Sequence, residues 1–103
     1  MKIEVTSAAD RGAWFRGQRE ARGIGLNDLA RRMGISPTFL SRFEQGKREV
    51  PAEDHLRIAA AELGLDGDDV VVRCGRVPED VTRWLLEDAA RMKKVRTMMG
   101  GAR

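Results

Sequence analysis

The chain has 103 residues, of which 42% are hydrophobic and 34% are charged, enough for one domain with a modest core under a charged surface. No run reaches the roughly 18 to 20 apolar residues that span a bilayer, and the N-terminus lacks the apolar core of a signal peptide. The single cysteine, Cys74, cannot form an intramolecular disulfide, and the single histidine, His55, leaves no zinc-site spacing. We therefore expect a soluble cytoplasmic protein with no metal and no cofactor.

Charge is distributed unevenly along the chain, although the net charge is only +3. Residues 11–48 carry nine basic and three acidic side chains, a balance of +6, whereas residues 49–90 carry four and eleven, a balance of −7. The last thirteen residues are basic again, with a balance of +5. This asymmetry favours a fold in which one part faces a polyanion. The alternative is an ordinary solvated surface.

Glycine and proline divide the chain into segments with helical periodicity. Thr6 or Ser7 is a suitable N-cap for the first helix. Ser36 followed by Pro37 is the clearest start signal, because an N-cap residue precedes a proline at the first helical position. The predicted helices cover approximately residues 8–22, 26–33, 37–45, 51–63, 66–74 and 78–99.

The segments at residues 66–74 and 78–99 carry further sequence signals. The three valines at 70–72 favour a strand, yet the preceding acidic cluster suits a helix N-terminus. We expect a short helix, because no partner strand is evident apart from a possible strand over residues 2–5. The last segment is a long amphipathic helix with basic residues near its end. Its apolar stripe consists of Val81, Leu85, Ala89, Met92, Val95 and Met99.

The second and third predicted helices are joined by a very short turn that contains Gly34, which is the arrangement of a helix-turn-helix. Ala30 is placed where the two helices cross, and a larger side chain there would separate them. Gly34 is placed where the turn needs a positive φ. We expect Ala30 and Gly34 to be structural, with Ile35, Leu40 and Phe43 facing inward.

The run from Arg19 to Arg48, REARGIGLNDLARRMGISPTFLSRFEQGKR, closely resembles the lambda-repressor-like (Cro/XRE-type) family of DNA-binding domains in the order and spacing of many positions. The resemblance covers roughly residues 8–73. It implies an all-α fold, a compact five-helix bundle with a helix-turn-helix, which binds double-stranded operator DNA, usually as a dimer. On this basis residues 1–75 are the DNA-binding domain, and residues 76–103 are a C-terminal helix for dimerisation or partner binding.

The resemblance implies that the third helix enters the major groove. An arginine there can bind guanine through two hydrogen bonds, and a threonine methyl can pack on a thymine methyl. Hydroxyl, amide and cationic groups beside it position the protein on phosphates without reading sequence. The implied base contacts are Pro37, Thr38, Phe39 and Arg42. The implied phosphate contacts are Ser36, Ser41, Gln45, Lys47 and Arg48, although a solvated loop is the alternative for the last two.

Arg19 and Glu44 match a pair that forms a salt bridge in several family members, and we expect them to be structural. The chain also departs from the family pattern. Leu26 stands where a glutamine commonly touches the DNA backbone, so we expect that contact to be absent. Gly17 weakens the first helix by ~1 kcal/mol relative to alanine. Trp14 replaces a polar residue, and either marks a contact surface or packs under residues 2–5.

No nucleophile motif or phosphate-binding glycine loop is present, so we expect no catalysis. We expect Cys74 to be a small buried residue and His55 to lie on the surface of the fourth helix.

The first reading of function is a sequence-specific transcriptional regulator, a dimeric repressor that acts by occupying its operator. The alternative is an antitoxin that binds a partner protein and represses its own operon. A dimer would use the distal half of the last helix, with the basic residues there as competing phosphate contacts. The residues expected at that interface are Met92, Val95 and Met99.

Overall fold

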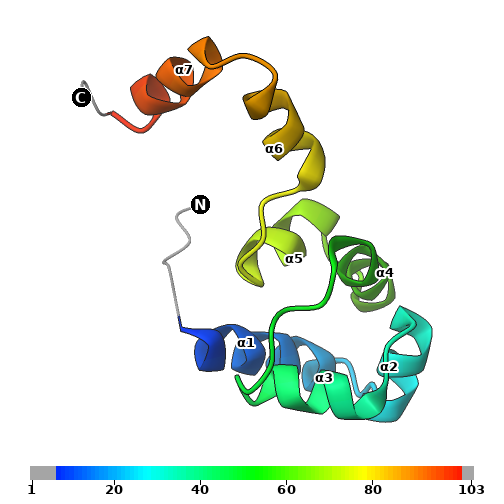
Figure 1. Cartoon of the computed structure of the whole chain (residues 1–103). Helices are drawn as coiled ribbons and strands as arrows, with labels where there is room; N and C mark the ends of the chain where they lie inside the picture. The colour runs from blue at the N-terminus through cyan, green and yellow to red at the C-terminus, as the bar shows by residue number, and fades with distance from the viewer. Residues whose placement is uncertain (1–6, 101–103) are drawn as a thin grey trace.

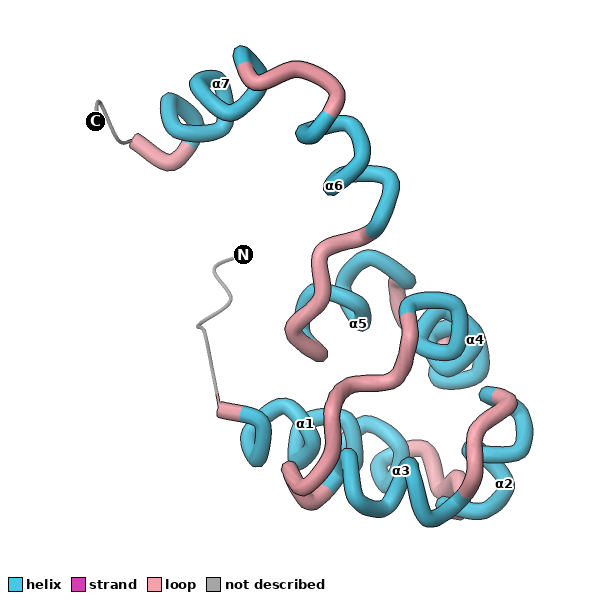
Figure 2. The backbone as a smooth tube through the Cα atoms, viewed as in Figure 1, coloured by secondary structure: helices cyan, strands magenta, loops and turns pink. Residues whose placement is uncertain are grey.

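The computed structural model of the chain describes residues 7–100, which contain seven helices and no strand (Figures 1 and 2). The all-α prediction is therefore confirmed for this part of the chain. The strand predicted over residues 2–5 lies outside the described residues. The helices are α1 (Ala8–Ala21), α2 (Leu26–Met33), α3 (Pro37–Glu44), α4 (Glu53–Leu63), α5 (Gly67–Arg73), α6 (Glu79–Leu86) and α7 (Ala90–Met98).

Most helix boundaries follow the end signals in the sequence. Ser7 is the N-cap of α1 within a capping box, and the Ser36 hydroxyl oxygen accepts the Phe39 N–H at 3.0 Å at the start of α3. Asp66 caps α5 in the same way, which confirms the short helix predicted in place of a strand. The start of α4 differs, since this helix begins two residues after Pro51.

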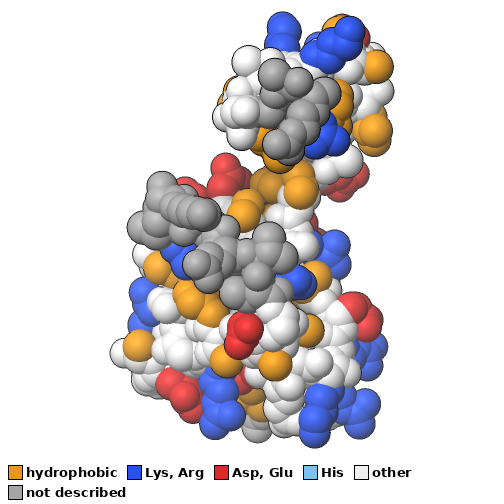
Figure 3. All heavy atoms as spheres, turned by 90° about the vertical axis from the view of Figure 1, so that its left-hand side faces the viewer, with side chains coloured by type: hydrophobic (Ala, Val, Ile, Leu, Met, Phe, Trp, Pro, Cys, Tyr) orange, Lys and Arg blue, Asp and Glu red, His pale blue; other side chains and the backbone are white. Residues whose placement is uncertain are grey.

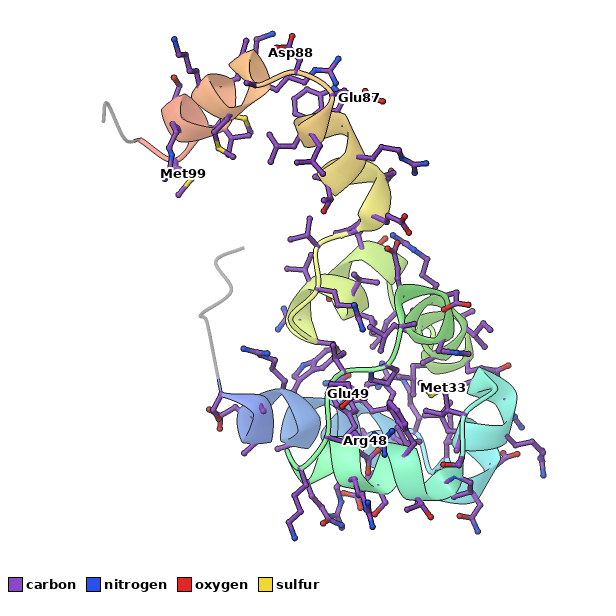
Figure 4. The ribbon with its side chains drawn as sticks, viewed as in Figure 1. Met33, Arg48, Glu49, Glu87, Asp88 and Met99 are labelled. Carbon is purple, nitrogen blue, oxygen red and sulfur yellow. The ribbon has the colours of Figure 1, made fainter. Side chains whose placement is uncertain are left out.

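The C-terminal segment is two helices, so the single helix predicted over residues 78–99 is wrong, and so is the count of five helices plus one. The interruption lies at Asp88, whose Oδ1 accepts the Ala90 N–H at 2.9 Å. An aspartate side chain that bonds to a nearby backbone amide competes with the helical hydrogen bond. Arg91 braces the corner, because its guanidinium lies 4.7 Å from the centre of the Trp84 ring. Figure 4 shows Asp88 at this corner.

The hydrophobic core is built by α1–α5 and the residues at their ends. At its centre the rings of Phe15 and Phe43 meet edge to face, with centroids 5.6 Å apart. Trp14 is half-buried against this core and carries the Arg73 guanidinium over its ring at 5.5 Å. The buried hydrophobic residues are Phe15, Leu29, Ala30, Met33, Leu40, Phe43, Leu56, Ala59, Ala60, Leu63, Val70, Val71 and Cys74.

Helices α6 and α7 form an arm that projects from the bundle of α1–α5 (Figures 1 and 3). Neither helix contains a buried residue. The radius of gyration is 15.4 Å and the longest extent is 46 Å, whereas a compact chain of this length has a radius of gyration of about 13 Å. The arm therefore leaves apolar side chains in solvent, with Leu86 exposed by 79% and Met98 by 85%. Among the described helices, none has the length and apolar character needed to cross a membrane.

Candidate nucleic-acid interface

The α2–α3 pair has helix-turn-helix geometry. Gly34 ends α2 with φ +80°, in the left-handed region that favours glycine, and the Ile35 N–H returns to the Ala30 carbonyl at 3.0 Å. Ala30 is fully buried where the helices meet. The structural roles predicted for Ala30 and Gly34 therefore agree with this geometry. His55 adds a contact from α4, since its Nδ1 lies 2.6 Å from the Met33 carbonyl oxygen at the end of α2.

The exposed face of α3 lies in a shallow groove of about 390 Å³. Thr38 and Arg42 are one helical turn apart and are both exposed, so their side chains are accessible to a ligand in this groove. The Ser41 hydroxyl oxygen accepts a hydrogen bond from Gln45 Nε2 at 3.1 Å, which orients the amide. The groove is lined by Leu26, Asn27, Pro37, Thr38, Ser41, Arg42 and Gln45.

Phe39 differs from the other residues predicted to contact bases. It is half-buried, and the Arg48 guanidinium lies 4.4 Å from the centre of its ring. Arg48 also lies 3.5 Å from a Glu49 carboxylate oxygen, and Figure 4 shows both side chains in the loop after α3. Phe39 therefore holds Arg48 beside α3. Lys47 is exposed next to it, with its backbone N–H bonded to the Arg42 carbonyl at 2.8 Å.

A buried ion pair fixes α3 to α1. Arg19 donates from Nε and Nη2 to the two carboxylate oxygens of Glu44, both at 2.8 Å, and donates from Nη1 to the Ile24 carbonyl at 2.9 Å. The hydrogen bond to Glu44 raises the pKa of Arg19 above its ordinary value. This bidentate geometry ties the end of α3 to α1, which is the arrangement that the predicted structural roles of Arg19 and Glu44 require.

Several predicted residues lie elsewhere. Met92, Val95 and Met99 are on the arm, away from the α2–α3 face, and Figure 4 shows Met99 at its end. Cys74 is buried, as expected, and burial raises the pKa of its thiol to about 12, which favours the protonated thiol over the nucleophilic thiolate. His55 is half-buried against α2, so its placement on the surface of the fourth helix is corrected.

Two residues near the groove were not indicated by the sequence pattern. Asn27 lines the α3 groove from the first turn of α2, and Arg16 reaches a neighbouring hollow from α1. The available signal was Gly25 at the N-cap of α2, which offers no side chain to cap the first turn, where Asn27 lies. The position of Arg16 depends on how α1 packs, which periodicity alone does not define.

The sequence matches a known domain family and several known proteins. A helix-turn-helix domain model matches residues 12–72. An uncharacterized HTH-type transcriptional regulator of Mycobacterium tuberculosis is 37% identical over 64 residues, which are 62% of this chain and 45% of that protein. The HTH-type transcriptional repressor RghR of Bacillus subtilis is 32% identical over 68 residues, which are 66% of this chain and 50% of that protein. The chain thus spans about half the length of the curated relatives it matches.

Solved structures show the same likeness. Two crystal structures of the clp gene regulator ClgR from Corynebacterium glutamicum resemble this chain. One has a TM-score of 0.55 and 32% identity, and the match covers 69% of this chain and 91% of ClgR. The other has a TM-score of 0.57 and 29% identity, and the match covers 87% of this chain and 93% of ClgR.

Proposed function

The chain belongs to the helix-turn-helix domain family, and from that premise we propose that it is a sequence-specific, DNA-binding transcriptional regulator. The observation that carries the proposal is the exposed, polar face of α3, held rigidly by the buried Arg19–Glu44 pair. The names of its relatives, HTH-type regulators and a repressor, support the same class of function.

In this proposal α3 lies in the major groove of double-stranded DNA. Arg42 hydrogen-bonds to a guanine edge, and Thr38 packs its methyl group on a neighbouring thymine. Pro37 and Phe39 flank these two contacts. The phosphate contacts, which set register without reading sequence, come from Ser36, Ser41, Gln45, Lys47 and Arg48.

The regulator would act as a homodimer that represses by occupying its operator. One small domain reads few base pairs, and two copies on a two-fold site read twice as many. The solvent-exposed apolar side chains of the arm support a dimer, because burying them between two copies removes apolar surface from water. Met92, Val95 and Met99 are the proposed contacts.

The proposal is tested by selecting duplexes that bind the full chain from a random library and measuring affinity for the enriched sequence by fluorescence anisotropy. We expect an inverted repeat with half-sites about one helical turn apart. We also expect binding that is at least ~10³-fold tighter than to a scrambled duplex at the same salt concentration. Equal affinity for the enriched and scrambled duplexes would contradict sequence-specific regulation.

A further inference from the structure

The α3 groove continues toward α1. A second hollow of about 300 Å³ shares Leu26, Ser41 and Gln45 with the α3 groove. The two hollows therefore form one continuous surface that runs from the recognition helix across the first turn of α2 to α1. The residues that line only the second hollow are Arg16, Arg19 and Glu44.

Charge at the α1 end of this surface is supplied by Arg16. Arg19 and Glu44 are buried and satisfy each other, so neither charge is available to a ligand. Leu26 offers no polar side-chain atom. The Arg16 side chain is exposed by 56% and lines the second hollow together with Ser41 and Gln45. Of the residues that line the second hollow, it is the accessible cation.

Arg16 forms a weak, solvent-exposed ion pair with Glu20. Its Nε lies 3.2 Å from Glu20 Oε2, one turn along α1, and the Glu20 side chain is exposed by 55%. Ion pairs of this kind contribute little stability, because both groups remain solvated. A phosphate at the rim would offer Arg16 a stronger, bidentate acceptor, and the Glu20 carboxylate would compete with that phosphate.

We infer that Arg16 is a DNA phosphate-binding residue, which exchanges its ion pair with Glu20 for a backbone phosphate at the α1 end of the groove. The inference rests on the proposed function, since it assumes that the α3 face meets DNA. It extends the proposed phosphate-binding surface from α3 and its flanking residues to α1, and it assigns Glu20 as the competitor that weakens binding.

The test is the salt dependence of binding to a random-sequence duplex. Each phosphate contact contributes about 0.9 to the slope of log affinity against log salt concentration. We expect Arg16→Gln to lower the magnitude of that slope by about one unit. When salt is raised from about 50 to 200 mM, the variant should therefore lose affinity by a factor about threefold smaller than the wild type does. Arg16→Lys keeps the charge and should keep the slope. Arg83→Gln, which removes an arginine from α6, should also leave the slope unchanged.

Glu20→Gln tests the competition directly. Removing the competing carboxylate should tighten binding to the same duplex, and Arg16→Gln in that background should cancel the gain. An Arg16→Gln protein with the wild-type slope would overturn the inference while leaving the proposed function intact. An unchanged affinity for Glu20→Gln would overturn the exchange. If the wild type itself failed to bind any duplex, the proposed function would fail first.

Discussion

At the scale of single residues, Arg42 is the side chain on which the proposed base reading most depends. It is exposed in the α3 groove one turn from Thr38. We predict that Arg42→Ala costs about 1–3 kcal/mol at the selected operator and relaxes preference at one base pair. Anisotropy titrations against single-base operator variants measure both effects. Lys47→Ala is the control, because the loss of a proposed phosphate contact should lower affinity uniformly across sequences. If Arg42→Ala lowered affinity equally for the operator and for random duplexes, Arg42 would be a phosphate contact instead.

Two glycines of α1 provide a matched pair for stability. A Cβ on Gly12 would lie 2.3 Å from the Phe43 carbonyl oxygen, so alanine there forces α1 away from α3. A Cβ on Gly17 would meet no atom within 4 Å. We predict that Gly12→Ala lowers the free energy of unfolding by about 1–3 kcal/mol or more. Gly17→Ala should raise it by up to ~1 kcal/mol, because alanine favours helix. Urea unfolding measures both, and equal effects would contradict the α1–α3 packing.

The residues that could be predicted are those whose role follows from local geometry. Gly34 ends a helix in a short turn, and Ala30 lies where that turn forces two helices together. The Arg19–Glu44 pair followed from family resemblance rather than from spacing. His55 against Met33 could not be predicted, because it depends on where α4 crosses α2, and the same holds for the Arg48 guanidinium over Phe39.

At the scale of helices, the apolar stripe of the C-terminal segment stays in helical phase across Asp88, which is why one helix was predicted there. The apolar periodicity gives no sign of a side chain that hydrogen-bonds to a nearby backbone amide. Here the Asp88 carboxylate accepts the Ala90 N–H, and this hydrogen bond divides the segment. The hydrophobic pattern was therefore sufficient to identify helix content but insufficient to predict the corner between α6 and α7.

Glu53 links the start of α6 to the bundle. Its Oε1 accepts the Glu79 N–H at 2.7 Å and its Oε2 accepts from Arg57 Nε at 2.9 Å. The backbone hydrogen bond from Glu79, and then the hydrogen bond from Arg57, hold the pKa of Glu53 below its ordinary 4.5. A lowered folded-state pKa means that this stabilisation is fully present above the unfolded value and is lost as pH falls through the folded value.

We therefore predict that the Glu79 amide signal in NMR spectra shifts with an apparent pKa below 4.5, as protonation of Glu53 weakens the attachment. Glu53→Gln keeps an acceptor oxygen but removes the titration, so the shift should disappear in that variant. Glu62→Gln, on the same helix but bonded to Arg32, is the control and should leave the Glu79 titration unchanged. A Glu79 signal that does not follow pH would show that the carboxylate does not hold α6.

At the scale of the whole molecule, the two oppositely charged segments of the sequence correspond to different sets of helices. The +6 segment, residues 11–48, contains nearly all of α1 to α3 and so carries the proposed DNA face, whereas the −7 segment, residues 49–90, contains α4 to α6. DNA would be attracted to the first part and repelled by the second, which orients the bundle on approach. Helix α7 is basic again and lies at the end of the arm, so two competing roles are proposed for it, dimer contact and phosphate contact.

Removing α7 separates these roles. Because α7 contributes no buried residue, truncation after Asp88 should leave the bundle folded, with a far-ultraviolet spectrum scaled only for the lost helix. Met99, exposed by 69%, would go with the rest of the proposed interface. We predict a monomer by light scattering, with weaker and non-cooperative operator binding, because a two-fold site needs two recognition helices about 34 Å apart.

The full chain with Lys93, Lys94 and Arg96 changed to alanine should remain a dimer and show only a lower salt slope if these side chains meet phosphates. A truncated chain that stays dimeric would place the interface outside α7, either on the retained α6 or on the bundle around Trp14 or α4 and α5.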